Sequence, residues 1–181
     1  GIIAVADTIK EDSKIAIVSP TKPLNAQHVK TFSEHTTIPL EEVALVTGIT
    51  KPEERKKLYE KKVIIATPQT LKEDITNNRL SFKDFSLLAV DEAHRATGNY
   101  AYNFLANNYL LTSTSPLILA LTASPGGTKT EIEEIKSNLH IEAVEIRTEE
   151  DIKEHIQEKK AVWLEVELPP ELKQLQSLIK S

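Results

Sequence analysis

SLLAVDEAHRA, at residues 86–96, is the stretch of sequence that best predicts the fold. Its apolar run, residues 87–90, is bounded by polar residues, which is typical of a strand buried on both faces of a parallel sheet. Two adjacent carboxylates, Asp91 and Glu92, follow directly. In nucleotide hydrolases an acidic residue at such a strand end holds Mg²⁺ against the phosphates. The helix dipole also favours an acidic first helical turn, so these residues alone leave both interpretations open.

Composition narrows the class of protein. The chain has 181 residues, 40% hydrophobic and 27% charged, which is typical of one sizeable globular domain or one domain plus a fragment. It has no apolar run of membrane-spanning length and no signal-peptide pattern. Because it has no cysteine, it forms no disulfide or thiolate metal site, and we expect a cytoplasmic protein in a reducing compartment.

The net charge of −5 argues against a broad basic face for nucleic acid, although it leaves room for a narrow basic track. The chain also has no methionine, and it opens within an apolar, helix-like run at residues 2–9. We therefore expect it to be part of a longer protein.

Short apolar runs alternate with helix-like segments. We expect strands at residues 14–19, 43–46, 63–66, 87–90 and 117–121, and helices at residues 20–35, 51–62, 69–78, 98–111 and 129–139. This alternation predicts βαβ units and an α/β fold with an open parallel sheet. Residues 141–146 alternate apolar and polar, which predicts an edge strand. After the charged residues 148–160, residues 161–181 are expected to lie outside the first domain.

Each of the five apolar runs ends in a small polar cluster. The clusters contain Thr21-Lys22, Thr47-Gly48, Thr67-Pro68-Gln69, Asp91-Glu92-Ala93-His94 and Thr122-Ala123-Ser124. In an open parallel sheet these clusters share one edge, where ligands bind, and hydroxyls and lysines there can contact phosphates. The same residues also suit helix caps and turns. Five such clusters on one edge favour the ligand interpretation.

Other polar residues carry weaker signals. The pattern G-x-x-x-x-G-K-[ST] does not occur, and GGTKT at residues 126–130 predicts only a turn and a helix start. His94 could bridge to Thr122 or Ser124 on the neighbouring strand end. We expect the remaining histidines on surfaces or helix faces; these are His28, His35, His140 and His155. A solvated helix face is expected for the basic residues Arg55, Lys56, Lys57, Lys61 and Lys62. The tyrosines are expected in the core or at an interface; these are Tyr100, Tyr102 and Tyr109.

Taken in order, the motifs PTKPL, TG, ATPQT, VDEAH and LTASPG resemble those of the first RecA-like domain of superfamily 2 helicases, over about residues 1–147. PTKPL followed by Gln27-His28, ATPQT, and DEAHRATGNYAY are most similar to the archaeal Hef helicase and the Fanconi anaemia M-type branched-DNA helicases. The resemblance implies a RecA-like (P-loop NTPase) sheet with helices on both faces. It also implies that residues 148–181 are a charged linker and the start of a helical insert domain.

The resemblance further implies cofactors and residue roles. ATP and Mg²⁺ would be the cofactors, with Asp91 and Glu92 at the metal, partly through water, and Glu92 activating the attacking water. Asp91, Glu92 and His94 would be catalytic, and His94, Thr122 and Ser124 would couple nucleotide state to grip on nucleic acid. The residues implied to contact the phosphate backbone of one strand are Thr21, Lys22, Thr47, Gly48, Thr67 and Gln69.

The implied activity is that of an ATP-dependent DNA helicase or translocase acting on branched or forked DNA in the repair of stalled replication forks. A second RecA-like domain of the same chain would be its partner and would supply arginine fingers. Without the Gly-Lys-Thr motif and that domain, we expect residues 1–181 alone to be inactive. A Dicer-like or RIG-I-like RNA helicase and a nucleic-acid-binding module that has lost catalysis are the alternatives.

Overall fold

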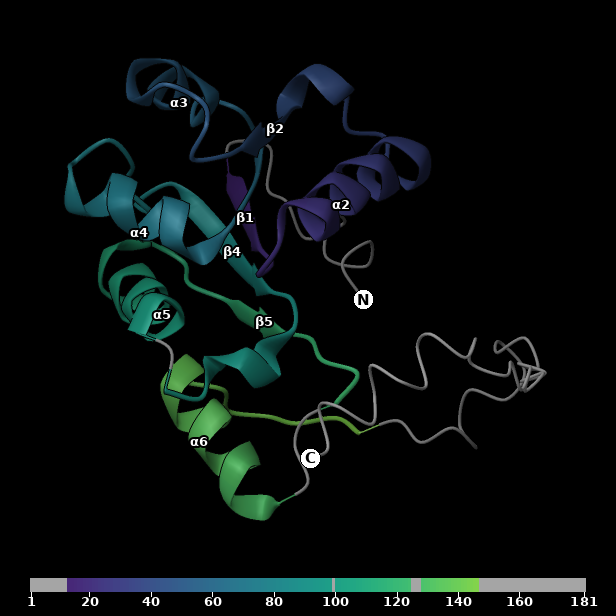
Figure 1. The fold of residues 1–181 in the computed structure, drawn as a ribbon, viewed down its shortest axis with the longest axis vertical. Helices are drawn as coiled ribbons and strands as arrows, with labels where there is room; N and C mark the ends of the chain where they lie inside the picture. The colour runs from purple at the N-terminus through teal and green to yellow at the C-terminus, as the bar shows by residue number, and fades with distance from the viewer. Residues whose placement is uncertain (1–12, 99, 125–127, 147–181) are drawn as a thin grey trace, which may run out of the picture. The chain divides into compact units, whose positions relative to one another are not determined.

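A five-stranded parallel sheet with strand order β2-β3-β1-β4-β5 forms the centre of the fold (Figure 1). The structure is a computed structural model that describes residues 13–98, 100–124 and 128–146. The strands are β1 (Lys14–Val18), β2 (Val43–Val46), β3 (Val63–Ala66), β4 (Phe85–Val90) and β5 (Ile118–Ala120). The helices are α2 (Lys22–His35), α3 (Pro52–Leu58), α4 (Pro68–Thr76), α5 (Tyr100–Thr112) and α6 (Lys129–Leu139), with 3-10 turns η1 (Leu40–Glu42) and η2 (Ala93–Ala96).

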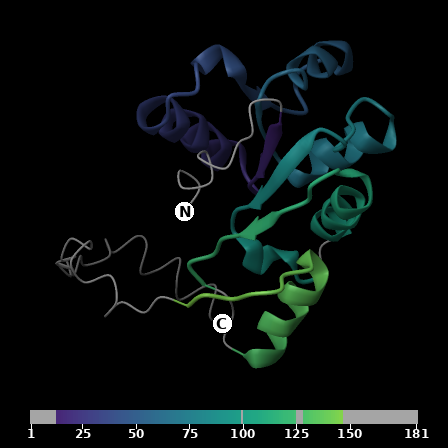
Figure 2. The same ribbon diagram turned by 180° about the vertical axis from the view of Figure 1, so that it is seen from behind.

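Alternate residues of the strands supply two apolar cores, one on each face of the sheet. Ile15 and Ile17 of β1 pack in the same core as Phe32 of α2. Ala16 and Val18 point the other way, into a core that includes side chains of α4, α5 and α6. Figures 1 and 2 show α2 on one side of the sheet and α4 and α5 on the other. The predicted α/β sheet with helices on both faces is confirmed.

The strand register brings the polar clusters together. Val18 of β1 is paired with both Ala66 of β3 and Val90 of β4. Ala66 is also paired with Val46 of β2, and Val90 with Ala120 of β5. The segments that follow all five strands therefore leave from one edge of the sheet. This edge, the carboxyl edge, is where ligands bind in open α/β sheets.

Two predicted helix starts have clear local causes. Thr21 caps α2, since its side chain accepts a 3.4 Å hydrogen bond from the Leu24 N–H, and Pro23 occupies the first turn. Thr128 and Glu131 form a capping box at the start of α6. The predicted helix start at residues 128–130 is confirmed, while residues 126–127 lie outside the described part of the chain.

The core tyrosines were predicted correctly where they are described. Tyr102 and Tyr109 are buried in α5, and the ring of Tyr109 packs edge-on against Phe82 at 5.5 Å between centroids. Burial raises the pKa of the Tyr102 hydroxyl to about 12. Both rings hold α5 against the sheet. The side chain of Tyr100 lies outside the described residues.

The edge strand predicted at residues 141–146 is wrong. This segment is described and forms no strand, and Val144 and Ile146 are exposed. Alternation predicts a half-buried extended segment, but a strand also needs a neighbour with a free edge to pair with. The helix predicted at residues 51–62 is also shorter, because the chain turns at residues 59–61 before β3 begins.

The chain divides into two compact units, residues 1–144 and 145–181. The helix end predicted at residues 2–9 and the linker and insert domain predicted at residues 148–181 lie outside the described residues, and this domain assignment stays a prediction. In the described part of the chain, no helix is both long and apolar enough to cross a membrane.

Candidate functional site

Asp91 lies at the carboxyl end of β4, on the carboxyl edge between the ends of β1 and β5. Its backbone N–H donates a 2.8 Å hydrogen bond to the carbonyl of Val18, so the strand pairing extends to the acidic residue itself. Its side chain is 21% exposed, and one carboxylate oxygen, Oδ1, accepts a 3.0 Å hydrogen bond from the Glu92 N–H. The carboxylate is therefore held in one orientation while one side faces solvent.

Glu92 turns the chain sharply away from the sheet. Its backbone is left-handed, with φ +52° and ψ +46°, which is uncommon for a residue with a side chain. The next residue, Ala93, is buried and begins η2, and its N–H donates a 2.9 Å bond to the carbonyl of Leu121 beyond β5. Such backbone strain costs about 1–3 kcal/mol and is concentrated at functional sites.

His94 joins the ends of β4 and β5, as the sequence predicted. Its Nδ1 lies 3.2 Å from the Glu92 Oε2 and 2.9 Å from the Thr122 Oγ1. Thr122 Oγ1 also accepts a 3.1 Å hydrogen bond from the backbone N–H of Ser124. A chain of polar contacts thus runs from the acidic pair to the loop after β5. The hydroxyl of Ser124 has no part in it, and Ser124 is exposed.

His28 is a site residue that the sequence analysis missed. It was expected on a surface or helix face, but its Nε2 lies 2.8 Å from the Asp91 Oδ2, and its side chain is 14% exposed. His28 lies two turns into α2, and no local pattern connects it to a residue 63 positions away. Only the strand order, which places β1 and its following helix beside β4, could have indicated the contact.

The donor chemistry at Asp91 and Glu92 fits Mg²⁺. The described residues contain no group of three or more His, Cys, Asp or Glu side chains that could hold a metal ion. Mg²⁺ does not need one, because it usually takes one or two carboxylates and completes its shell with water and substrate phosphates. Asp91 and Glu92 offer the carboxylates at an edge that solvent reaches.

The other predicted residues lie along the same edge, after β1, β2 and β3. Thr21 uses its hydroxyl to cap α2, while the neighbouring Lys22 side chain is exposed. The hydroxyls of Thr47 and Thr67 pair with Thr50 and Thr70, at 3.3 and 2.9 Å. Gly48 is exposed in the loop after β2, and Gln69 is exposed in the first turn of α4.

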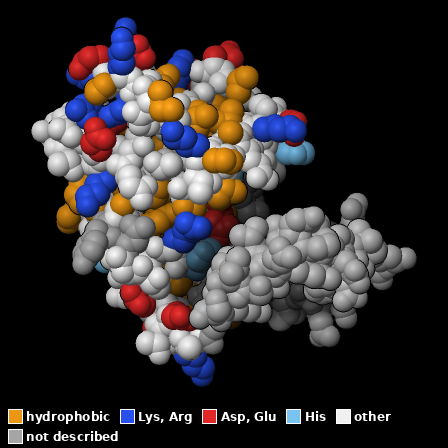
Figure 3. Space-filling model, viewed as in Figure 1, with side chains coloured by type: hydrophobic (Ala, Val, Ile, Leu, Met, Phe, Trp, Pro, Cys, Tyr) orange, Lys and Arg blue, Asp and Glu red, His pale blue; other side chains and the backbone are white. Residues whose placement is uncertain are grey.

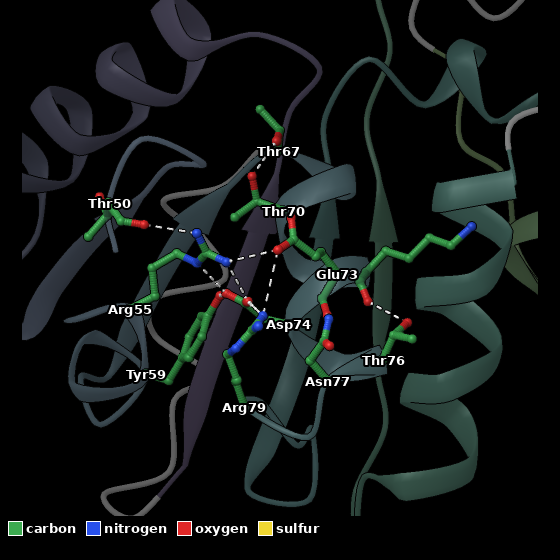
Figure 4. Close-up of polar contacts among 11 residues, drawn as sticks. Thr50, Arg55, Tyr59, Thr67, Thr70, Glu73, Asp74, Thr76, Asn77 and Arg79 are labelled. Atoms are coloured by element: carbon green, nitrogen blue, oxygen red, sulfur yellow. Dashed lines mark hydrogen bonds and ion pairs between the residues drawn. The ribbon is translucent and has the colours of Figure 1, made fainter. Parts of the chain in front are cut away.

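Beside these loops lies a buried ionic cluster that the sequence analysis also missed. Arg55, expected on a solvated helix face, is almost fully buried and donates two 2.7 Å hydrogen bonds to the carboxylate of Asp74 (Figure 4). Asp74 also accepts hydrogen bonds from the Tyr59 hydroxyl at 2.5 Å and from Arg79 at 2.7 Å. The glutamates next to Arg55 in the sequence, Glu53 and Glu54, are exposed, so its partner lies on another helix.

The contacts within this cluster favour the charged forms of Asp74 and Arg55. Burial alone would raise the pKa of the Asp74 carboxyl, but the hydrogen bonds from Arg55, Tyr59 and Arg79 outweigh it and lower that pKa. The Asp74 hydrogen bond raises the pKa of Arg55, and burial followed by the same carboxylate raises the pKa of Tyr59. Asp74 is therefore ionised and Tyr59 neutral near neutral pH.

Basic side chains do not form a single surface on the described residues visible in Figure 3, where Lys and Arg are scattered among acidic and apolar groups. This agrees with the net charge of −5. Any attraction for a polyanion on this face would have to be local.

Comparisons with known proteins agree with this geometry. A family model described as DEAD/DEAH box helicase matches residues 1–133. A Methanocaldococcus jannaschii protein named as an ATP-dependent RNA helicase is 39% identical over 182 residues, 98% of this chain and 23% of its own. The ATP-dependent DNA helicase mph1 of Sclerotinia sclerotiorum is 43% identical over 148 residues, 80% of this chain and 12% of its own.

One solved structure extends the likeness to three dimensions. The crystal structure of the Pyrococcus furiosus Hef helicase domain is 40% identical, with a TM-score of 0.82, and the match covers 98% of this chain and 39% of that one. The predicted RecA-like fold is confirmed by this match. The chain spans less than a quarter of the two curated relatives, 23% and 12%. With five motifs on one sheet edge and a family match over most of its length, the chain belongs to the DEAD/DEAH box helicase family.

Proposed function

We propose that this chain is the first RecA-like domain of an ATP-dependent DNA helicase or translocase that acts on branched or forked DNA, in the repair of stalled replication forks. The observation that carries the proposal is the polar chain from Asp91 and Glu92 through His94 to Thr122, which links the acidic pair to the next strand end. The name of the mph1 relative, an ATP-dependent DNA helicase, supports DNA as the substrate.

The acidic pair would carry the hydrolysis of ATP. Asp91 would hold Mg²⁺, partly through water, and bound Mg²⁺ supplies positive charge that offsets the charge developing on the phosphates. Glu92 would orient the attacking water and accept its proton. The left-handed turn at Glu92 supports this role, because it takes the side chain out of the strand direction while Asp91 stays in register.

His94, Thr122 and Ser124 would couple hydrolysis to movement. His94 Nδ1 contacts both Glu92 and Thr122, so a change at the nucleotide can alter the loop after β5 through two contacts. The Thr122 hydroxyl in turn holds the backbone of Ser124. Ser124 would contribute its backbone here. A second RecA-like domain of the same protein would complete the site with arginine fingers.

The nucleic acid would lie across the loops after β1, β2 and β3. Lys22 offers an exposed charge, Gly48 and Gln69 offer exposed backbone or amide groups, and Thr21, Thr47 and Thr67 lie beside them. These groups suit phosphates rather than base edges, so binding would tolerate many sequences. A track of this kind needs no basic face, which agrees with the scattered cations.

An RNA substrate is the second candidate, since the Methanocaldococcus jannaschii relative is named as an RNA helicase. The deciding experiment measures ATP hydrolysis by the full-length protein with forked DNA, linear duplex DNA or double-stranded RNA as activator. We expect forked DNA to activate most. Activation by double-stranded RNA alone would overturn the DNA assignment, and no activation by any of them would overturn the helicase proposal.

A further inference from the structure

We propose that Arg55 is a positioning residue that fixes the spacing between the loop at residues 47–50 and the start of α4 at residues 67–70. The inference rests on the proposed function, in which these two segments contact neighbouring phosphates of one strand. Nothing in the polar clusters themselves requires Arg55, which lies in α3 and touches neither phosphate nor nucleotide in that scheme.

The first contact of Arg55 holds the loop after β2. Its Nη1 donates a 2.8 Å hydrogen bond to the backbone carbonyl of Thr50. That loop is already closed on itself, because the Thr50 N–H donates to the carbonyl of Thr47 at 3.1 Å and their hydroxyls lie 3.3 Å apart. Fixing the Thr50 carbonyl therefore fixes Thr47 and the exposed Gly48 between them.

The second contact holds α4. The Nε and Nη2 of Arg55 each donate a 2.7 Å hydrogen bond to the Asp74 carboxylate. This bidentate pair fixes the orientation of the carboxylate as well as its distance from Arg55. Asp74 lies two turns after Thr67, the residue that precedes α4, and a helix transmits position along its axis. Figure 4 shows Arg55 between Thr50 on one side and Asp74 on the other.

The two held segments are neighbours. They follow β2 and β3, whose last residues Val46 and Ala66 are paired. Adjacent strands lie about 5 Å apart, so two loops leaving them can contact nearby phosphates only if their spacing is kept. The hydroxyl oxygens of Thr67 and Thr70 lie 2.9 Å apart, so Thr67 is held against the first turn of α4.

Stability alone explains the cluster poorly. Arg55 is 3% exposed and Asp74 0%, and apolar side chains of similar volume often stabilise a core as well as a buried ion pair does. A planar guanidinium, however, can reach a carboxylate with two donors and a carbonyl with a third, which a lysine cannot do. The arrangement thus favours a role in geometry over a role in packing.

The test compares Arg55→Lys with Tyr59→Phe in the full-length protein. Lysine can keep one ionic contact with Asp74 but cannot also hold Thr50. Tyr59→Phe removes a different hydrogen bond to Asp74, of 2.5 Å, and leaves the Thr50 contact intact. For each variant we would measure the affinity for a labelled single-stranded DNA, the affinity for a fluorescent ATP analogue, and the midpoint of denaturation.

We expect Arg55→Lys to weaken DNA binding by about tenfold, as expected when one or two hydrogen bonds to phosphates are misplaced. Its affinity for the ATP analogue should stay within about twofold of wild type, and Tyr59→Phe should change neither affinity by more than that. Arg55→Lys with wild-type DNA affinity would overturn the inference. So would DNA affinities that fall in both variants in proportion to lost stability, since that pattern belongs to a purely structural role.

If Arg55→Lys does not fold, Arg55→Gln is the second variant, because its neutral amide leaves Asp74 paired with Arg79 and Tyr59. The same comparison with Tyr59→Phe then decides. A wild-type protein that binds neither single-stranded nor forked DNA would overturn the proposed function and this inference with it. Loss confined to Arg55 variants of a DNA-binding wild type would support both.

Discussion

At the scale of single residues, Glu92 combines two demands on one position. Its backbone is left-handed, which most side chains avoid, and its carboxylate contacts His94. A glycine would meet the first demand at no cost but would leave no carboxylate. An acidic residue at a strained backbone position therefore favours a role for its side chain over a role for the turn.

Glu92→Gln in the full-length protein tests that requirement. The glutamine amide keeps the size and shape of the glutamate side chain but cannot accept a proton from water. ATP hydrolysis should therefore fall roughly 10²- to 10⁴-fold. Binding of a fluorescent ATP analogue should stay near that of wild type. Hydrolysis at a near-normal rate would remove Glu92 from the mechanism.

Thr122→Val tests the coupling. Valine keeps the shape of threonine but removes the Oγ1 that lies 2.9 Å from His94 and accepts the Ser124 N–H. We expect DNA-stimulated ATP hydrolysis to persist while strand separation, measured on the same forked DNA, falls at least about tenfold. Thr97→Val is the control, because Thr97 directly follows η2 and its hydroxyl donates a hydrogen bond to the His94 backbone carbonyl rather than to the imidazole ring. Equal losses of hydrolysis and unwinding would contradict a coupling role.

Sequence reasoning reached the contacts that lie at strand ends and missed those that depend on which elements are neighbours. The bridge from His94 to Thr122 follows from two clusters on one edge, and it was predicted. The contact of His28 with Asp91 needs the strand order β3-β1-β4, which no residue pattern encodes. Arg55 was misassigned because the interleaved charges of residues 53–62 are typical of a solvated face, and its partner Asp74 is 19 positions away.

At the scale of elements, the sequence predicts the positions of strands better than the ends of helices. Strand positions were predicted well because buried runs such as VIIA at residues 63–66 are short, branched and bounded by polar residues. Helix ends were predicted less well, as the early end of α3 shows. The false strand at residues 141–146 shows that alternation without a pairing partner is not enough.

Asp74→Asn tests the buried cluster through pH. Because the pKa of Asp74 is lowered from its ordinary value of 3.8, the unfolded chain binds a proton more readily than the folded one. The stabilisation is therefore fully present above that value and is lost as pH falls through the lower, folded pKa. The variant should cost about 3–5 kcal/mol of unfolding free energy near neutral pH, and the difference from wild type should shrink in acid.

Leu71→Ala, in the same helix α4, is the matched control. Leu71 is fully buried and does not titrate, so its truncation should cost about 2–5 kcal/mol at every pH where the protein folds. Both variants would be measured by denaturant unfolding. A difference between wild type and Asp74→Asn that stays constant with pH would contradict the assigned pKa direction.

The capping box of α6 provides a smaller test. Thr128→Ala removes the hydroxyl that accepts from the Glu131 N–H, which should lower the unfolding free energy by about 1 kcal/mol. Thr130→Ala, at an exposed position within the same first turn, should change it by less than about 0.5 kcal/mol. Equal effects of the two changes would indicate that the cap does not contribute.

At the scale of the whole molecule, a net charge of −5 and the scattered cations on the face shown in Figure 3 favour a localised contact with DNA. Binding should fall as salt rises, with few phosphates neutralised and little dependence on base sequence. Lys22→Ala in the full-length protein should weaken binding to all sequences alike and reduce the slope of log affinity against log salt by about 1. Lys83→Ala, at the amino end of β4 and so away from the carboxyl edge, should leave the slope unchanged.

The strand order also has a consequence for how the chain acquires its structure. β1 comes first among the described strands, yet it lies at the centre, between β3 and β4. Its two neighbours end at residues 66 and 90, so in an emerging polypeptide the largely apolar β1 is not paired on both sides until both have been synthesised. Strand pairings between residues this far apart in the sequence form slowly, and until they form they leave aggregation-prone apolar surface exposed. We expect chaperone dependence during synthesis to end only after β4 has left the ribosome.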